Sequence, residues 1–477
     1  MLQVVRSLLK KVWLAYMSRR DRRKRAALGI GSGPLPIELW GGAVNQKGHL
    51  VIGGEDTVSV VQRYGTPLYL VDHARLIGDF GDFVDCFRRR YPQVEVDYSY
   101  KTNPLPGVLQ ALHEAGAGAE VISPFELWLA LRLGVPPSKI TFNGPAKTEA
   151  GLETAIRAGI RLINIDSKGE IPIMQGLARK YNRIQQVGIR VTTSVGWSSQ
   201  FGLSIQSGAA REAFEDALAS ENLDACALHI HLGTGIKEPK TYGKAIEEVL
   251  EFAEALREDL GARFRYLDFG GGFGVPTVKS YSPSDLRLIA NGYRPTVVDT
   301  TAAPPLDAYA TVIADLMDRY WRGKSDRPTL LFEPGRAVTS SSQLLLLSVL
   351  AIKKSQNGHF NVILDGGLNV AQPASFESHE TFPASRMRDE PSGIMNLCGP
   401  LCHPADVLAW KKNMPLLEPG DVIAIMDAGA YLVSNQMHFS NPKAAAVMVR
   451  DGTAKLIRER ESFEGVVRLD SPIVNLD

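Results

Sequence analysis

This sequence has few cysteines, almost no net charge and no long apolar runs. Only four of the 477 residues are cysteine, and their spacing is neither that of a zinc ribbon nor that of a disulfide-rich scaffold, which suits a reducing cytoplasm. The formal net charge of +1 gives no general attraction to nucleic acid or membrane. No apolar run is long enough to cross a bilayer. We therefore expect a cytoplasmic protein without a membrane span that acts on small molecules.

The length and composition indicate more than one domain. The chain is 44% hydrophobic and 22% charged, as in globular proteins with a large core, and it exceeds the roughly 250 residues of a single α/β barrel. Its first 27 residues carry nine Lys or Arg against one Asp, with apolar positions at helical spacing, which predicts a basic amphipathic helix. Such a helix either lies free in solvent or docks on an acidic partner protein or an anionic membrane. We assign residues 1–40 to this extension and a linker.

Eight short apolar runs, each followed by a segment with helical periodicity, occupy the middle of the chain. Strands that alternate with helices in this way predict an α/β fold, a closed parallel (β/α)8 barrel of the TIM type over residues 73–335. A doubly wound open sheet is the alternative. The runs are residues 94–101, 117–123, 139–144, 161–166, 186–192, 226–233, 265–272 and 329–335.

A second domain follows the barrel. Beyond residue 336 the chain has strand-like runs such as SQLLLLSVLAI and DVIAIMDAG, separated by Gly, Pro or Asn turns, which predicts a mostly β domain over residues 336–477. A similar run precedes the barrel. We expect residues 41–72 to contribute strands to the same domain and so to make it discontinuous.

Polar and charged residues collect where the predicted barrel strands end, which is where α/β barrels carry their chemistry. Lys101 ends the first strand, and His231 ends the sixth. Gly270–Gly272 follow the seventh strand, and Glu333 with Arg336 follows the eighth. A core needs no such charged groups at one rim, so together they predict an active site.

The glycines and the lysine point to pyridoxal phosphate. Glycines after the seventh strand let backbone N–H groups approach an anion, and Arg336 and Thr234 can donate to the same phosphate. A lysine desolvated by neighbouring aromatic rings is expected to be partly neutral and nucleophilic, as a covalent link to this cofactor requires. A carboxylate such as Glu333 beside the pyridine nitrogen makes the ring a strong electron sink. The flat imidazole of His231 can stack on that ring.

With these residues in place, the chain resembles the fold-type III pyridoxal-phosphate decarboxylases, the group that contains diaminopimelate and ornithine decarboxylases. The motifs that carry the resemblance are YSYKTN, HIHLGTG, LDFGGGFG, LLFEPGR, CGPLCHPADVL and DAGAY. It implies that Lys101 holds the cofactor covalently, that His231 stacks on it and that Glu333 pairs with the pyridinium. The phosphate site it implies consists of Gly270, Gly271, Gly272, Thr234 and Arg336, with Tyr431 nearby.

The resemblance also implies a homodimer with shared active sites. Cys402 matches a family cysteine that a second subunit offers to the site, where it can protonate the carbanion left after loss of carbon dioxide.

The positions that would bind the far end of the substrate differ from those of the diaminopimelate decarboxylases. Those enzymes have Glu after the cysteine and an Arg-Pro-x-x-Tyr stretch, whereas this sequence has His403, Gln372 and Phe376. These differences remove charge from the distal pocket, and a charged end buried without a partner is costly. We therefore predict an amino-acid substrate with a neutral, acylated, citrate-attached or carrier-protein-bound distal group, in a siderophore or secondary-metabolite pathway. Diaminopimelate, ornithine or lysine is the alternative.

Other classes of protein fit parts of the sequence less well. His229 and His231 form a His-x-His pair like that of barrel metallohydrolases, but the pair lies on the sixth strand and not the first, so we expect no metal. An amino-acid racemase would share the barrel, yet Glu333 and the Cys402 motif favour decarboxylation. A non-catalytic pyridoxal-phosphate carrier would be a bare barrel.

Overall fold

The computed structural model describes residues 34–197, 200–281, 303–354 and 358–470, with residue 286 and several positions between 8 and 23. The described positions between 8 and 23 are helical, in line with the predicted N-terminal helix. The remainder of that prediction lies outside the described residues. In the described part of the chain, no helix combines the length and apolar character needed to cross a membrane.

Eight parallel strands close into a barrel, which confirms the predicted fold class. The ring closes because β14 pairs with β5, so a doubly wound sheet is excluded. Each strand lies within or beside a predicted run, since strands buried on both faces are continuously apolar. The bounds are β5 Val94–Ser99, β6 Gly118–Val121, β7 Ile140–Phe142, β8 Leu162–Ile165, β9 Gln185–Thr192, β11 Leu223–His229, β12 Tyr266–Asp268 and β14 Thr329–Phe332.

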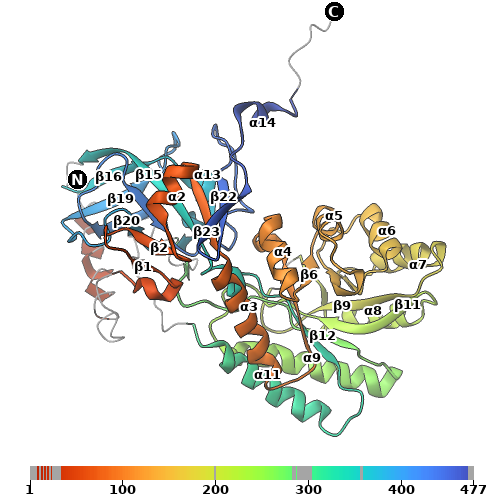
Figure 1. Ribbon diagram of the computed structural model, residues 1–477. Helices are drawn as coiled ribbons and strands as arrows, with labels where there is room; N and C mark the ends of the chain where they lie inside the picture. Colours follow the sequence, from red (N-terminus) through yellow and green to blue (C-terminus); the bar gives the residue numbers. More distant parts are fainter. Residues whose placement is uncertain are drawn as a thin grey trace, which may run out of the picture.

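Helices connect these strands and cover the outside of the barrel (Figure 1). At the start of α5, Ser123 Oγ accepts the Glu126 N–H at 3.2 Å, while the Glu126 carboxylate accepts the Ile122 N–H at 2.8 Å. The Ser and Glu therefore cap the helix at the spacing of a capping box, with the carboxylate bonded one residue earlier than in that motif. The helix bounds are α3 His73–Arg88, α4 Pro106–Glu114, α5 Pro124–Arg132, α6 Glu149–Ala158, α7 Glu170–Lys180, α8 Ala209–Leu218, α9 Pro239–Leu260 and α11 Leu306–Trp321.

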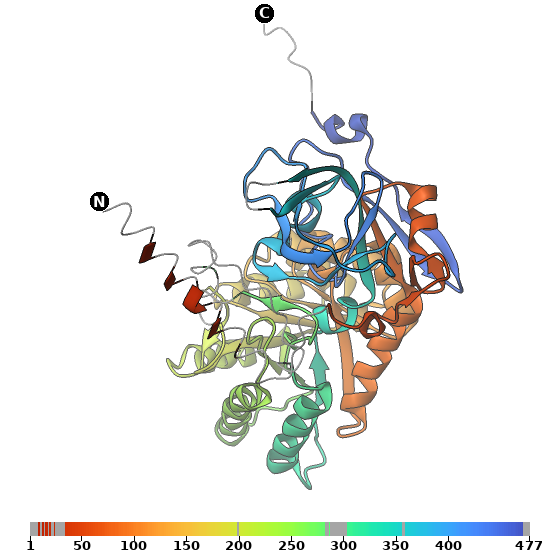
Figure 2. The ribbon, with the colours of Figure 1, turned by 90° about the vertical axis from the view of Figure 1, so that its left-hand side faces the viewer.

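The second body is mostly β and is discontinuous in sequence, as predicted. Strand β4 precedes the barrel, yet it pairs antiparallel with β15 and parallel with β22, which follow it. Strands β1 to β3 form a separate small sheet, in which the Leu50 N–H reaches the Ala384 carbonyl at 2.8 Å. The domain boundaries at residues 40, 72 and 335 stay predictions. In Figure 2 the blue strands of this body lie above the barrel.

The strands of the β body are β1 Ala43–Val44, β2 Leu50–Ile52, β3 Glu55–Asp56, β4 Leu68–Asp72, β15 Gln343–Lys354, β16 Phe360–Leu364, β18 Thr381–Pro383, β19 Gly393–Cys398, β20 Val407–Met414, β21 Val422–Ile425, β22 Ala445–Arg450 and β23 Thr453–Arg458. A two-stranded ribbon of β13 Lys279–Ser280 and β17 Glu377–Ser378 ties the loop after β12 to this body. Strand β10 Leu203–Ser204 extends β9. The short helices are η1 Ile37–Trp40, α2 Thr57–Tyr64, η2 Tyr100–Thr102, η3 Pro137–Lys139, α12 Arg336–Thr339, α13 Leu368–Ala371, η4 Gln372–Ser375 and α14 Phe463–Val467.

Candidate active site

A cavity of about 360 Å³ lies where the carboxyl ends of the barrel strands meet the β body. Most residues predicted for the site lie in its wall or in that of a narrower recess beside it, although more than three hundred positions separate the first from the last. The predicted residues found there are Lys101, His231, Thr234, Gly272, Glu333, Arg336, Phe376 and Tyr431.

Lys101 follows β5 in the turn η2, and a carboxylate holds its amine. Its Nζ lies 2.7 Å from Ser99 Oγ and 2.7 Å from Glu120 Oε2. Burial alone would lower the pKa of Lys101, but the carboxylates of Glu120 and Glu333 outweigh burial and raise the pKa. These carboxylates favour the charged amine over the partly neutral one predicted from the sequence. The sequence showed the neighbouring tyrosines but not that Glu120 points at the lysine.

His231 presents a neutral ring to the cavity. Its Nδ1 lies 3.4 Å from the Gly271 backbone nitrogen, which donates to it, and its ring centroid lies 5.9 Å from that of Trp197. Burial, together with the charge of Lys101, lowers the pKa of His231 to about 3. An uncharged flat imidazole in this position is suited to stack on an aromatic cofactor.

The glycines after β12 are fixed by close backbone packing. Gly270 and Gly272 have φ angles of +63° and +86°, which disfavour a side chain. A Cβ on Gly271 would lie 2.2 Å from the Glu333 carbonyl oxygen. This turn therefore brings the backbone at the end of β12 directly against the end of β14.

The recess beside the cavity fits an anionic group such as phosphate. Gly272 and Gly335 leave part of its wall without side chains, and Thr234 borders it. Among the described residues, two buried polar atoms of this wall, Thr102 Oγ1 and Arg336 Nη1, form no hydrogen bond. Backbone N–H groups, hydroxyls and guanidinium groups are the usual partners of bound phosphate.

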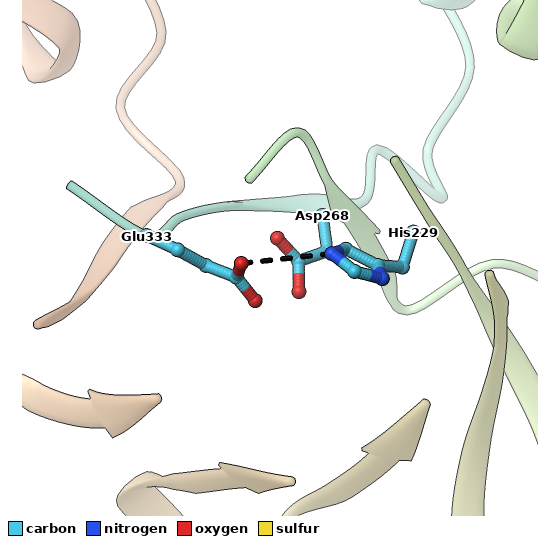
Figure 3. A group of neighbouring side chains, drawn as sticks. All are labelled: His229, Asp268 and Glu333. Carbon is cyan, nitrogen blue, oxygen red and sulfur yellow. Dashed lines mark ion pairs between the residues drawn. The ribbon is translucent and has the colours of Figure 1, made fainter. Parts of the chain in front are cut away.

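Glu333 ends the eighth barrel strand within a buried polar cluster, in which His229 and Asp268 lie beside it (Figure 3). Its Oε2 lies 3.5 Å from His229 Nε2, and its Oε1 accepts a hydrogen bond of 2.5 Å from Asn143 Nδ2. Burial opposes a charge on Glu333, but His229 and Lys101 outweigh burial and lower the pKa of this carboxyl. An ionised carboxylate in the cavity wall is the group that a pyridinium nitrogen requires.

Arg336 and Glu377 bring charges of both signs to the cavity. Arg336 Nη2 lies 2.5 Å from Glu377 Oε1, and both side chains are buried. The guanidinium also lies 5.3 Å from the ring centroid of Tyr431, whose backbone N–H donates to the Thr102 carbonyl at 2.8 Å. The cavity wall therefore carries charges of both signs, which the prediction from Gln372, Phe376 and His403 did not take into account.

Cys402 and His403 lie outside this cavity. Both are exposed, in the loop between β19 and β20. Gln372 is half-buried in η4 and does not belong to the described lining, whereas Phe376 does. The predictions that Cys402 reaches the site of a second subunit and that Gln372 and His403 select the substrate stay predictions.

Besides Glu377, several polar residues that were missed in the sequence line the cavity, among them three from the barrel strands. Glu120, Asn143 and Arg190 come from β6, the end of β7 and β9. Arg190 lies 4.6 Å from the ring centroid of Phe201 and 3.4 Å from an Asp166 oxygen. A carboxylate or guanidinium inside an apolar run, as in AGAEVIS and QVGIRVT, was the available signal, because such groups are rarely buried without a role.

The closed barrel, the lysine after its first strand and the ionised Glu333 define a pyridoxal-phosphate-dependent carboxy-lyase. The bound cofactor supplies an electron sink for the bond that breaks at the substrate α-carbon. A family model described as "Pyridoxal-dependent decarboxylase, pyridoxal binding domain" matches residues 82–340. The chain belongs to this family, and the metallohydrolase alternative is wrong.

Known relatives cover nearly the whole chain. Over 439 residues the chain is 33% identical to the diaminopimelate decarboxylase of Methanothermobacter thermautotrophicus, which covers 89% of this chain and 96% of that protein. The diaminopimelate decarboxylase of Aquifex aeolicus is 28% identical over 435 residues, 88% of this chain and 96% of its own. The crystal structure of the Methanocaldococcus jannaschii diaminopimelate decarboxylase matches with a TM-score of 0.81 at 26% identity, covering 90% of this chain and 98% of that one.

Proposed function

We propose that this decarboxylase acts on an amino acid of the diaminopimelate type, whose far end carries both an ammonium and a carboxylate. The observation that carries the proposal is the buried ion pair of Arg336 and Glu377 in the cavity wall. A zwitterionic end can exchange into this pair, with its carboxylate on Arg336 and its ammonium on Glu377, so that neither charge is left without a partner. The near full-length similarity to diaminopimelate decarboxylases supports the same substrate class.

At the reacting end, the roles follow from the contacts of each side chain. We assign Lys101 to covalent attachment of the cofactor, with Glu120 holding its amine at 2.7 Å. His231 covers one face of the ring, and Glu333 keeps the pyridine nitrogen protonated. Gly272, Gly335 and Thr234 border the phosphate together with Arg336, whose Nη1 has no hydrogen bond among the described residues while its Nη2 pairs with Glu377.

A second copy of the chain completes the site in this proposal. Cys402 is exposed and lies in a motif that resembles the family's shared cysteine, so the dimer would place its thiol over the neighbouring cavity. There it delivers a proton to the substrate carbon after carbon dioxide has left. A cytoplasmic location accompanies the proposal as an expectation.

A substrate with a neutral, acylated, citrate-attached or carrier-bound distal group is the second candidate. Trp197 and Phe201 stack with ring centroids 6.1 Å apart and line the cavity with Phe376. Such a wall suits an uncharged extension better than an ammonium group.

Release of carbon dioxide from a panel of substrates tests both candidates. The panel contains meso-diaminopimelate, D- and L-ornithine, lysine, and N-acyl and carrier-bound diamino acids. Turnover of meso-diaminopimelate at least about tenfold above every other member is the expected result. Higher turnover of the acylated or tethered members would replace the first candidate by the second. Deleting residues 1–27 then tests docking of an acidic carrier, because only the tethered substrate should lose turnover.

A further inference from the structure

Asp268 lies beside the cofactor-facing carboxylate without bordering the cavity. It ends β12, and its Oδ1 accepts the Gly270 N–H at 3.0 Å while its Oδ2 accepts the Asn164 Nδ2 amide at 3.2 Å. Glu333 and His229 complete the cluster. One side-chain nitrogen or oxygen atom from each of the three residues lies within 4.8 Å of the corresponding atoms of the other two. Figure 3 shows the three side chains converging from neighbouring strand ends. All three are buried.

Two carboxylates this close inside a barrel cannot both ionise at low cost, so one of them holds a proton. The negative charge belongs on Glu333, because it borders the cavity, receives the Asn143 amide at 2.5 Å and faces the charged Lys101. Asp268 does not border the cavity, and the hydrogen bond that it accepts from the Asn164 amide is longer, at 3.2 Å. Burial and the neighbouring Glu333 raise the pKa of Asp268 well above its ordinary range.

The surrounding groups also favour a negative charge on Glu333 and a proton on Asp268. Asn143 donates from one amide nitrogen to both Glu120 and Glu333, and its oxygen accepts from Asn164. A chain of hydrogen bonds therefore links the carboxylate that holds Lys101 to Glu333. A hydroxyl on Asp268 can accept from Asn164 and donate to Glu333 at the same time, which an ionised carboxylate cannot do.

We propose that Asp268 is a positioning residue that carries a proton, donates it in a hydrogen bond to Glu333, and so keeps the Glu333 charge aimed at the pyridine nitrogen of the cofactor. The inference depends on the cofactor and not on the substrate. Its failure would leave the diaminopimelate proposal standing, and failure of that proposal would leave this one standing.

Cofactor binding provides the test. Protein stripped of cofactor is titrated with pyridoxal phosphate, and the dissociation constant and visible absorption spectrum are measured for the wild type, Asp268→Asn and Asp268→Ala. Asn keeps the shape and a donor toward Glu333, so we expect a dissociation constant within about twofold of the wild type and the same spectrum. Ala leaves Glu333 without this donor, so we expect cofactor binding about tenfold weaker. The spectrum should shift toward that of a reference variant, Glu333→Gln, which has no charge at the pyridine nitrogen.

A matched control separates this role from general loss of stability. Asp97 is another buried barrel carboxylate, hydrogen-bonded to Thr141 and paired with Arg161. Asp97 acts on Glu333 through its charge and not through a hydrogen bond, so Asp97→Asn should lower the unfolding midpoint and change the spectrum less than Asp268→Ala does. The proposal is overturned if Asp268→Ala binds the cofactor with the wild-type constant and spectrum. It is equally overturned if Asp268→Asn is as impaired as Asp268→Ala, because a charge would then be needed in place of a proton.

Discussion

The two ends of the cavity are built differently. At the barrel end, the polar groups sit on or directly after parallel strands, and each is held by a neighbour, as Lys101 is by Glu120 and Glu333 by Asn143. At the end formed by the β body, Glu377 begins a strand of the short ribbon and Phe376 directly precedes it, and we propose that Cys402 comes from another subunit. In our proposal, the strand ends of the barrel hold the cofactor, and the segments of the β body contribute to binding of the substrate.

The largest effect should come from the barrel end. Lys101→Ala should lower carbon dioxide release by more than about a thousandfold, because among the described residues that line the cavity only Lys101 offers an amine for the covalent link. Borohydride reduction followed by peptide mapping should also lose its label. The control is Lys139→Ala, at an exposed lysine that donates only to the Gly116 carbonyl. A label that persists in Lys101→Ala would refute the assignment.

Next comes the residue that we place in a second subunit. Cys402→Ala should lower turnover about a hundredfold, the usual contribution of a positioned acid. Mixing this variant with Lys101→Ala should restore activity, because one of the two shared sites is then intact. Cys398→Ala, at a half-buried cysteine nearby, should behave as the wild type. If mixed dimers form without regaining activity, the two residues do not share a site.

A smaller effect is expected where the sequence departs from its relatives. Gln372→Arg combined with His403→Glu should lower the KM for diaminopimelate about tenfold, because charged hydrogen bonds to its distal end are added. The neutral pair Gln372→Met and His403→Gln serves as the control. An unchanged KM in both double variants would mean that the ion pair of Arg336 and Glu377 alone binds that end.

The smallest effect on activity is expected at Glu126, where the prediction concerns the stability of the folded protein. Burial, with help from the nearby Glu120 charge, raises the pKa of Glu126 from 4.5 to about 7. Since the folded state holds this proton more tightly than the unfolded state, the stabilisation is complete below about pH 4.5 and is lost as pH rises through about 7. Glu126→Gln should therefore raise the free energy of unfolding by up to about 3 kcal/mol at pH 8 and change it little at pH 4.5. Urea unfolding at both pH values measures this, with the exposed Glu114→Gln as control. Equal effects at both values would contradict the assignment.

Much of the barrel end could be predicted from the sequence because its signals are local. Each strand lies in a short apolar run, and Lys101, His231 and Glu333 each lie near the end of such a run. The contacts that set their charge are not local: Glu120 lies 19 positions from Lys101, and Glu377 lies 41 from Arg336. Composition and spacing do not reveal such pairs, so neither the carboxylate beside the lysine nor the ion pair in the cavity wall could be predicted.

The position of β4 between β15 and β22 has a consequence for the order of assembly. During synthesis, Leu68–Asp72 leaves the ribosome before the whole barrel, but neither strand that flanks it exists until the barrel is complete. The strand must wait with open edges while the parallel barrel forms, which exposes it to pairing with other chains. The barrel can therefore assemble first, and the β body closes last around a strand made near the beginning.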